Sequence, residues 1–230
     1  MGKKTKEYNI KYFNFPIVLL EGFLIDHISC LSNILDYAIY AYCDKYTIDD
    51  VSKPISFYHI KIIADQSSYQ NGKLLFESIS DTFPKVGIKT EIFEDFFHNE
   101  KTEFQKVVLL AFLSIKSILQ NKTYCKIDNK FLFARMDGKA KAIKDCTSLS
   151  KEVLKYYNEY QAKKIKMELI LGWNLIHYSR YTRGFYVSFK LTLDELIFQA
   201  EKKRRSRLEK NVVEEEKQSI KRAIERLSKL

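Results

Sequence analysis

Turn-forming residues are scarce in this sequence, which contains seven glycines and three prolines in 230 residues. All-β sandwiches and barrels need many turns, so this scarcity argues against them and favours helices. Intrinsic disorder is excluded as well, because 46% of the residues are hydrophobic and 14% are aromatic. That apolar surface is enough to offset the loss of chain entropy on folding. We therefore expect a mainly α-helical protein with one large domain or two small ones.

Long hydrophobic runs are also missing. The longest, residues 15–20 and 107–115, fall well short of the roughly 20 residues that cross a bilayer, and no apolar segment directly follows the basic start MGKKTKEYN. We expect neither a membrane span nor a secretion signal. Cys-x-x-Cys spacing is absent, which favours reduced, mostly buried thiols in the cytoplasm, although an even count leaves two disulfides open. The four cysteines are Cys30, Cys43, Cys125 and Cys146.

Catalytic motifs are lacking too. The sequence has no glycine-rich phosphate loop and no Arg-x4-6-His nuclease motif, since only His177 follows the first arginine, Arg135. A nucleophilic pair such as Cys146 with His177 stays open, but four Cys and four His need no catalytic explanation. We expect a non-enzymatic protein with no cofactor, no metal and no small-molecule substrate. The nearest metal candidate, with one Asp-x-x-His and no second copy, is Glu91, Glu94, Asp95 and His98.

Arginine is absent before position 135, and this absence reflects a segregation of charge. Residues 1–115 contain 12 lysines and 15 acidic residues, a net charge of −3, whereas residues 116–230 contain 27 basic and 14 acidic residues, a net charge of +13. A segregated basic half is an electrostatic footprint for a polyanion. The sequence therefore predicts a nucleic acid, or an acidic protein surface, as the partner of the second half.

The first region, residues 1–120, is predicted to be helical. Apolar residues recur at helical steps from Pro16 to Cys43, as one bent helix or two joined near Ser32–Asn33. Residues 53–66 could form a helix or a strand, Asn71-Gly72 indicates a turn, and a short acidic helix is expected from Thr90. Thr102-x-x-Gln105 has the spacing of a capping box ahead of residues 104–120. That segment is apolar on most sides, so we expect it at the centre of the core.

The second region, residues 121–192, suggests a helix-turn-helix followed by a β-hairpin, with a plain helical hairpin as the alternative. Asp128–Asn129 is an expected N-cap, and Ala134-x-x-x-Gly138 matches the small residue and turn glycine of the motif. A second helix is expected over residues 139–145, and a third from Ser150 to Leu171. The segments WNLIHYS and FYVSFKL then flank RYTRG as a hairpin, which completes the order of a winged helix. Candidate binding residues here are Lys139, Lys141 and Lys144 on the second helix and Arg180, Tyr181 and Arg183 at the hairpin tip.

The third region, residues 193–230, is predicted to be one long charged helix of about 55 Å, opened by a second capping box at Thr192-x-x-Glu195. Arginine suits phosphate because its planar fork donates two parallel hydrogen bonds. The candidate binding residues of this long helix are Lys202, Lys203, Arg204, Arg205 and Arg207. The alternatives are a solvated helix face, or a scaffold whose 3-4-3 seam of Ile220, Ala223, Leu227 and Leu230 pairs with a partner helix. Tyrosines that could stack on unpaired bases are Tyr156, Tyr157, Tyr160, Tyr178 and Tyr181.

In its heavy use of Lys, Ile, Tyr, Phe and Asn, with NFPIVLLEGFLIDHISCL and RYTRGFYVSFKLTLDEL as its most recognisable pieces, the chain resembles accessory proteins of phages and prophages. Its size and its lack of enzyme motifs are similar to those of anti-CRISPR proteins, including inhibitors of RNA-guided type VI effectors. That resemblance implies an inhibitor in the cytoplasm of an infected or lysogenic host, which binds the effector ribonucleoprotein and interferes with its guide or target RNA. ARMDG at 134–138 and the RYTRG hairpin resemble winged-helix replication initiators and regulators, which implies DNA binding instead.

Overall fold

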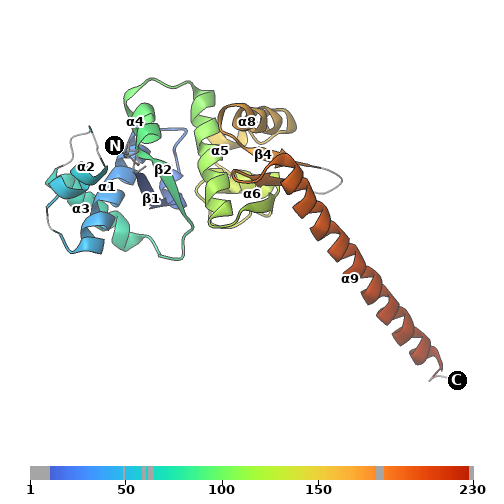
Figure 1. Cartoon of the computed structure of the whole chain (residues 1–230). Coiled ribbons are helices and arrows are strands. Elements are labelled where there is room, and N and C mark those ends of the chain that lie inside the picture. Colours follow the sequence, from blue (N-terminus) through green and yellow to red (C-terminus); the bar gives the residue numbers. More distant parts are fainter. Residues whose placement is uncertain (1–10, 49, 59–60, 62–64, 180–183, 228–230) are drawn as a thin grey trace, which may run out of the picture.

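The computed structural model describes residues 11–48, 50–58, 61, 65–179 and 184–227, and it confirms the mainly helical fold, with helices forming 64% of it. Two lobes lie on either side of helix α5 (Glu103–Leu119), and helix α9 (Leu193–Leu227) projects from the second lobe (Figure 1). The N-terminal lobe contains β1 (Tyr12–Pro16), the 3-10 helix η1 (Ile17–Leu20), α1 (His27–Tyr46), α2 (Ser52–Tyr58), α3 (Gln66–Ser78), β2 (Lys85–Lys89) and α4 (Thr90–His98). The C-terminal lobe contains β3 (Tyr124–Ile127), α6 (Asn129–Met136), the 3-10 helix η2 (Cys146–Ser148), α7 (Lys151–Leu154), α8 (Glu159–Gly172), β4 (Ile176–Tyr178) and β5 (Phe185–Ser188).

The prediction of an α-helix opening at Pro16 is wrong, because Pro16 is the last residue of strand β1 and is followed by the 3-10 helix η1. This strand pairs antiparallel with β2, so that Phe13 lies opposite Ile88 and Phe15 opposite Val86. These four side chains are buried. Pro16 therefore belongs to a strand because residues 85–89, far along the chain, pair with residues 12–16.

Helix α1 begins only at His27. Gly22 turns the chain with a φ of +77°, and the Asp26 carboxylate caps the helix by accepting the amide of Ser29 at 3.0 Å. From there the helix runs unbroken through Ser32 and Asn33 to Tyr46, so the first region contains one helix here and not two.

The turn predicted at Asn71-Gly72 is wrong, since both residues lie inside α3. A Cβ atom on Gly72 would stand 2.1 Å from the backbone oxygen of Asp36 in α1. Beside it, the Asn71 side chain donates a hydrogen bond of 2.6 Å to the Asp36 carboxylate. The glycine is therefore present for the close approach of two helices rather than for a turn.

Helix α5 is the centre of the core, as predicted. Its capping box is complete, because the Thr102 hydroxyl accepts the amide of Gln105 at 3.2 Å and the Gln105 side chain accepts the amide of Thr102 at 2.9 Å. Its side chains join those of both lobes in one continuous cluster. The buried residues of the helix are Val107, Val108, Leu109, Leu110, Ala111, Leu113, Ser114, Ile115, Ser117 and Leu119.

The C-terminal lobe follows the predicted order only in part, because the first helix, α6, and the closing hairpin are present but no helix forms over residues 139–145. Strand β5 lies between β3 and β4 in an antiparallel sheet, so the hairpin of β4 and β5 is joined by a strand that precedes α6. The third helix expected over residues 150–171 is divided into α7 and α8, because Asn158 caps a new helix by accepting the amide of Gln161. The sheet has two buried faces. Phe185 and Val187 point into the main core, whereas Tyr186 points to the outer face.

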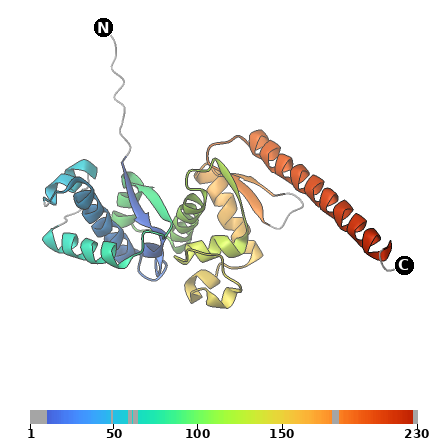
Figure 2. The same ribbon diagram turned by 90° about the horizontal axis from the view of Figure 1, so that it is seen from below.

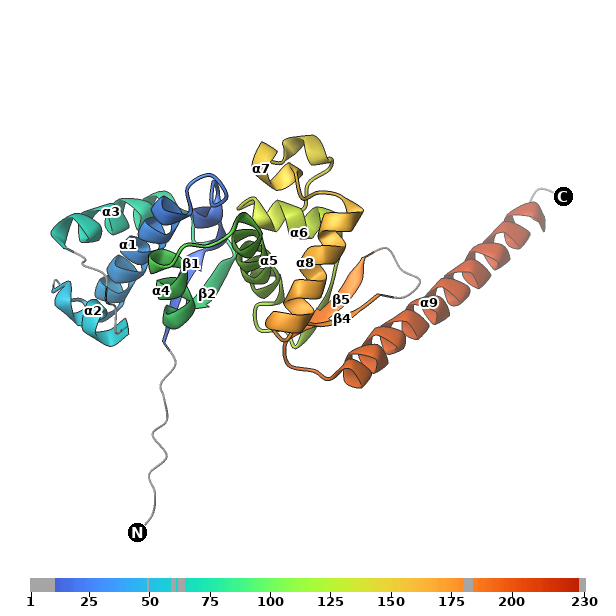
Figure 3. The ribbon, with the colours of Figure 1, turned by 90° about the horizontal axis from the view of Figure 1, so that it is seen from above.

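Helix α9 packs on that outer face with its first two turns only, through Leu196 and Ala200. Its capping box is also present, since the amides of Thr192 and Glu195 are each accepted by the other residue's side chain. Beyond these turns the helix leaves the body of the protein (Figures 2 and 3). No helix in the described part of the chain is long and apolar enough to span a bilayer.

Candidate nucleic-acid interface

The second helix expected over residues 139–145 is not present, because this segment is an irregular loop between α6 and η2. Carbonyl groups that would accept amides in a helix accept cationic side chains instead. Arg135 donates to the carbonyl of Ala140 at 3.1 Å, and Lys130 donates to that of Lys144 at 3.1 Å. The expected turn geometry at Gly138 is confirmed, with a φ of +71°.

Lys139 makes contacts within the protein. Its ammonium group forms an ion pair with the buried carboxylate of Asp137 and donates to the carbonyl of Ser148. Lys141 and Lys144 are exposed on the same loop. The three lysines therefore do not form the face of a recognition helix, which corrects the role that the sequence suggested for them.

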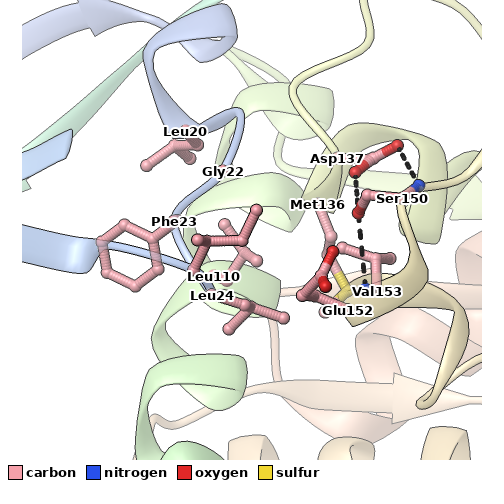
Figure 4. A pocket seen from close by; sticks show the side chains of 11 residues that line it. Leu20, Gly22, Phe23, Leu24, Leu110, Met136, Asp137, Ser150, Glu152 and Val153 are labelled. Atoms are coloured by element: carbon pink, nitrogen blue, oxygen red, sulfur yellow. Dashed lines mark hydrogen bonds between the residues drawn. The ribbon is translucent and has the colours of Figure 1, made fainter.

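Asp137 also joins the end of α6 to the start of α7 within the C-terminal lobe (Figure 4). Its carboxylate accepts the hydroxyl of Ser150 at 2.5 Å and the amide of the same residue at 3.0 Å. The cavity beside it is about 10 Å³ and lies between Gly22 of the N-terminal lobe and Val153 of α7. A space of this size holds about one water molecule, so we do not assign it a ligand.

Helix α8 is the helix that directly precedes the hairpin of β4 and β5 in the chain. Its inner face, Ala162, Ile165 and Leu169, is buried in the core. Its opposite face is exposed and mixes cations with large apolar or aromatic groups. This exposed face, which we call the α8 face, consists of Tyr160, Lys163, Lys164, Met167, Glu168 and Leu171, and so contains one acid beside the two cations.

Two hollows border the α8 face and share Asn129 and Lys166 as lining residues. One, of about 460 Å³, lies against Phe133 and Tyr157; the other, of about 500 Å³, extends from Lys130 to Phe185 of the hairpin. Burial lowers the pKa of Lys166. The hairpin tip, with Arg180, Tyr181 and Arg183, lies outside the described residues.

Behind the second hollow, His177 is on the inner face of β4 next to the Phe185 ring. Burial, and to a smaller extent the charge of Lys166, lowers the pKa of His177 to about 4. Its Nε2 atom is buried and has no hydrogen-bond partner among the described residues. The imidazole is therefore neutral and belongs to the core at physiological pH.

The strongest concentration of charge lies on the opposite face of the sheet. Because β3 and β5 alternate, Tyr124, Lys126 and Tyr186 point to the outer face, and Lys126 lies opposite Tyr186 in the strand register. Helix α9 diverges from the sheet after Ala200, and a groove of about 700 Å³ opens between them. This outer groove is lined by Tyr124, Lys126, Tyr186, Gln199, Lys202, Lys203, Arg204, Ser206, Arg207 and Lys210.

Six of these ten residues are basic and none is acidic. Only Arg204 forms an ion pair with another described residue, Glu201, at 2.7 Å. The Lys203 ammonium stands 4.6 Å from the centre of the Tyr124 ring. Like charges one helical turn apart, such as Lys203 and Arg207, repel each other, so a polyanion in the groove would relieve that repulsion.

The structure thus brings four of the predicted binding residues together, namely Lys202, Lys203, Arg204 and Arg207. Arg205 is exposed but does not line the groove. Sequence reasoning missed the sheet half, Tyr124, Lys126 and Tyr186, and also Lys210. The alternation of Tyr124 and Lys126 was a signal, but it gains meaning only when the strand register places both beside α9.

The candidate metal cluster on α4 is engaged in local contacts. Glu94 accepts the backbone amide of Lys61 at 2.9 Å, and Asp95 accepts the ammonium of Lys101 at 2.7 Å. Within the described ranges, no group of three or more His, Cys, Asp or Glu side chains could hold a metal ion. None of the four cysteines forms a disulfide; Cys30 and Cys43 are buried, and Cys125 and Cys146 are partly buried.

Comparisons of this chain with protein-family models, with curated proteins and with solved structures give no match. The interpretation of both surfaces therefore depends on their own geometry and charge.

Proposed function

We propose that this protein binds duplex DNA through its C-terminal lobe, as a winged-helix regulator or replication initiator of a mobile element, and acts by binding rather than by catalysis. The observation that carries the proposal is the order of α5, β3, α6, α8 and the β4–β5 hairpin, with β5 between the other two strands. This order leaves one helix with an exposed polar face directly beside a hairpin. A single exposed helix of this kind fits the major groove of B-DNA.

The α8 face supplies the chemistry that such a contact needs. Lys163 and Lys164 can neutralise phosphates and release condensed counterions. Tyr160 and Met167 on the same face offer apolar contacts to base edges, such as the thymine methyl group. Lys130 and Lys166 add cations to the neighbouring hollows, each of which also contains one acid, Glu159 or Asp128.

The experiment is selection from a random duplex library, followed by affinity measurement at one fixed salt concentration. We expect a preferred sequence bound at least ~10³-fold more tightly than random DNA. Replacing Lys163 and Lys164 with Glu should remove most of this binding. The matched control replaces the loop residues Lys141 and Lys144 with Glu, an equal change of charge away from α8, and should have a much smaller effect. Equally weak binding to every duplex would refute the proposal.

A second candidate function is inhibition of an RNA-guided nuclease, the type VI effector that the anti-CRISPR resemblance implies. The charge difference between the halves and the acid-free outer groove favour it, because guide RNA and acidic protein surfaces attract the same cations. Its test is a pulldown from host lysate with and without ribonuclease and deoxyribonuclease. A nuclease-resistant complex with one large effector supports inhibition, and recovery of one enriched duplex without a stoichiometric protein supports the first proposal.

A further inference from the structure

The outer groove is separate from the surface on which the proposed function depends. Ile165 and Leu169 of α8 belong to the main core with the inner-facing residues of the sheet, whereas the groove is formed by outer-facing residues of β3 and β5 and by α9. A ligand in the groove and a duplex on α8 would therefore occupy opposite faces of one thin sheet. The groove is therefore a binding surface distinct from the α8 face.

The floor and the wall of the groove differ in chemistry. The floor carries two tyrosine rings from adjacent strands, the partly exposed Tyr124 and the buried Tyr186, whose centres are 6.5 Å apart. The wall carries Lys203, Arg207 and Lys210, which follow one another at steps of four and three residues and so share one side of α9. Aromatic rings below and a line of cations above are the two elements that bind single-stranded nucleic acid.

We infer that the outer groove is a second binding site, specific for single-stranded nucleic acid. Cations alone would serve any polyanion, and a duplex offers them only its phosphates because its bases are stacked inside. An unpaired strand can use both elements, since its bases stack on a tyrosine while its phosphates meet the wall. At about 700 Å³ the groove is in the size range of ligand sites, which fits a short segment of one strand.

The Lys203–Tyr124 contact defines how the strand enters. The ammonium covers the ring at 4.6 Å, and such a cation–π contact is weak at an exposed site. A base that stacks on Tyr124 displaces the ammonium, which then becomes available to the adjacent phosphate. The Tyr124 hydroxyl, 3.4 Å from the Gln199 side chain, holds the ring beside α9 and is not required for stacking.

The test measures the affinity of the full chain for three fluorescent probes: a 12-residue oligothymidylate, an abasic strand of the same length, and a 12-base-pair duplex. We expect Tyr124→Leu to weaken oligothymidylate binding about tenfold and to leave the abasic strand unchanged, and Tyr124→Phe to behave as wild type. Lys126→Glu with Lys203→Glu should weaken both single strands about tenfold or more and make the salt dependence shallower by about 0.7 per lost contact. Lys217→Glu, which reverses one charge on the same helix beyond the groove, is the control.

Two results would overturn the inference. Equal affinity for oligothymidylate and the abasic strand, unchanged in Tyr124→Leu, would reduce the groove to a general polyanion surface. A loss in Lys217→Glu as large as that in the groove variant would assign the binding to the charge of α9 as a whole. Failure of the duplex proposal is seen separately, because the Lys163 and Lys164 variant removes duplex binding and should leave oligothymidylate binding intact.

Discussion

Helices α5 and α9 begin in the same way and end in opposite environments. Both open with a capping box, Thr102 with Gln105 and Thr192 with Glu195. Helix α5 is apolar on most sides and is buried between the lobes, whereas α9, over the side chains described as far as residue 222, is buried only at Leu196 and Ala200 and is mostly charged beyond them. A cap decides where a helix begins, but the apolar surface around it decides whether the helix is covered. The basic side chains of α9 are exposed to solvent because they do not pack in the core, and they are therefore available to a partner.

The largest difference should appear when the same truncation is made in both helices. Leu109→Ala removes a fully buried side chain from α5 and should lower the free energy of unfolding by about 3–5 kcal/mol. Leu208→Ala in α9 removes a side chain that is 50% exposed and should cost less than about 0.5 kcal/mol. Urea denaturation followed by circular dichroism measures both. Similar losses would mean that α9 is packed against a surface such as a second copy.

The second-largest effect is expected at His177, on the inner face of the sheet of β3, β5 and β4. This face packs in the same core as α5. The pKa of His177 is about 4 in the folded protein, mainly because of burial, and near 6.5 when unfolded. Between these values the unfolded chain binds the extra proton, so stability should fall as the pH falls from about 6.5 to about 4. We expect a contribution of about 1–2 kcal/mol, reduced because the ring keeps some solvent contact. Denaturation at several pH values should show a shallower dependence in His177→Gln, and an unchanged slope would contradict the buried, neutral ring.

A smaller effect separates the two caps. Thr102→Ala and Thr192→Ala each remove one cap worth about 1 kcal/mol. The loss at Thr102 should appear in global unfolding, because α5 unfolds only with the core. The loss at Thr192 should appear mainly as faster amide hydrogen exchange in the first turns of α9. An equal loss of global stability in both variants would show that α9 folds as part of the core.

The smallest effect is expected from removing the projecting part of α9. A chain that stops after Lys210 keeps every lining residue of the outer groove. Its unfolding midpoint should correspond to a change within about 0.5 kcal/mol, because the exposed helix contributes little packing. A clear loss of stability, together with a lower mass in sedimentation, would assign the seam that includes Ile220 to self-association.

Local features of the fold could be predicted because they depend on near neighbours. The caps at Thr102, Asp128, Ser150 and Thr192 join residues three positions apart, and the hairpin of β4 and β5 joins strands that are close in sequence. The predictions that were wrong depend on distant partners. Residues 12–16 become a strand because residues 85–89 pair with them, and Gly72 lies in a helix because α1 approaches it.

The candidate site also combines features that depend on near neighbours in the sequence with features that depend on distant ones. Composition alone placed the positive charge in the second half of the chain, and helical spacing placed Lys202, Lys203, Arg204 and Arg207 on one helix. Only the tertiary structure set these cations against Tyr124 and Lys126, because the register of β3 with β5 and the docking of Leu196 and Ala200 bring the two segments together. It also assigned Lys139 to a buried carboxylate, since a cation's role depends on which anion lies nearest in space.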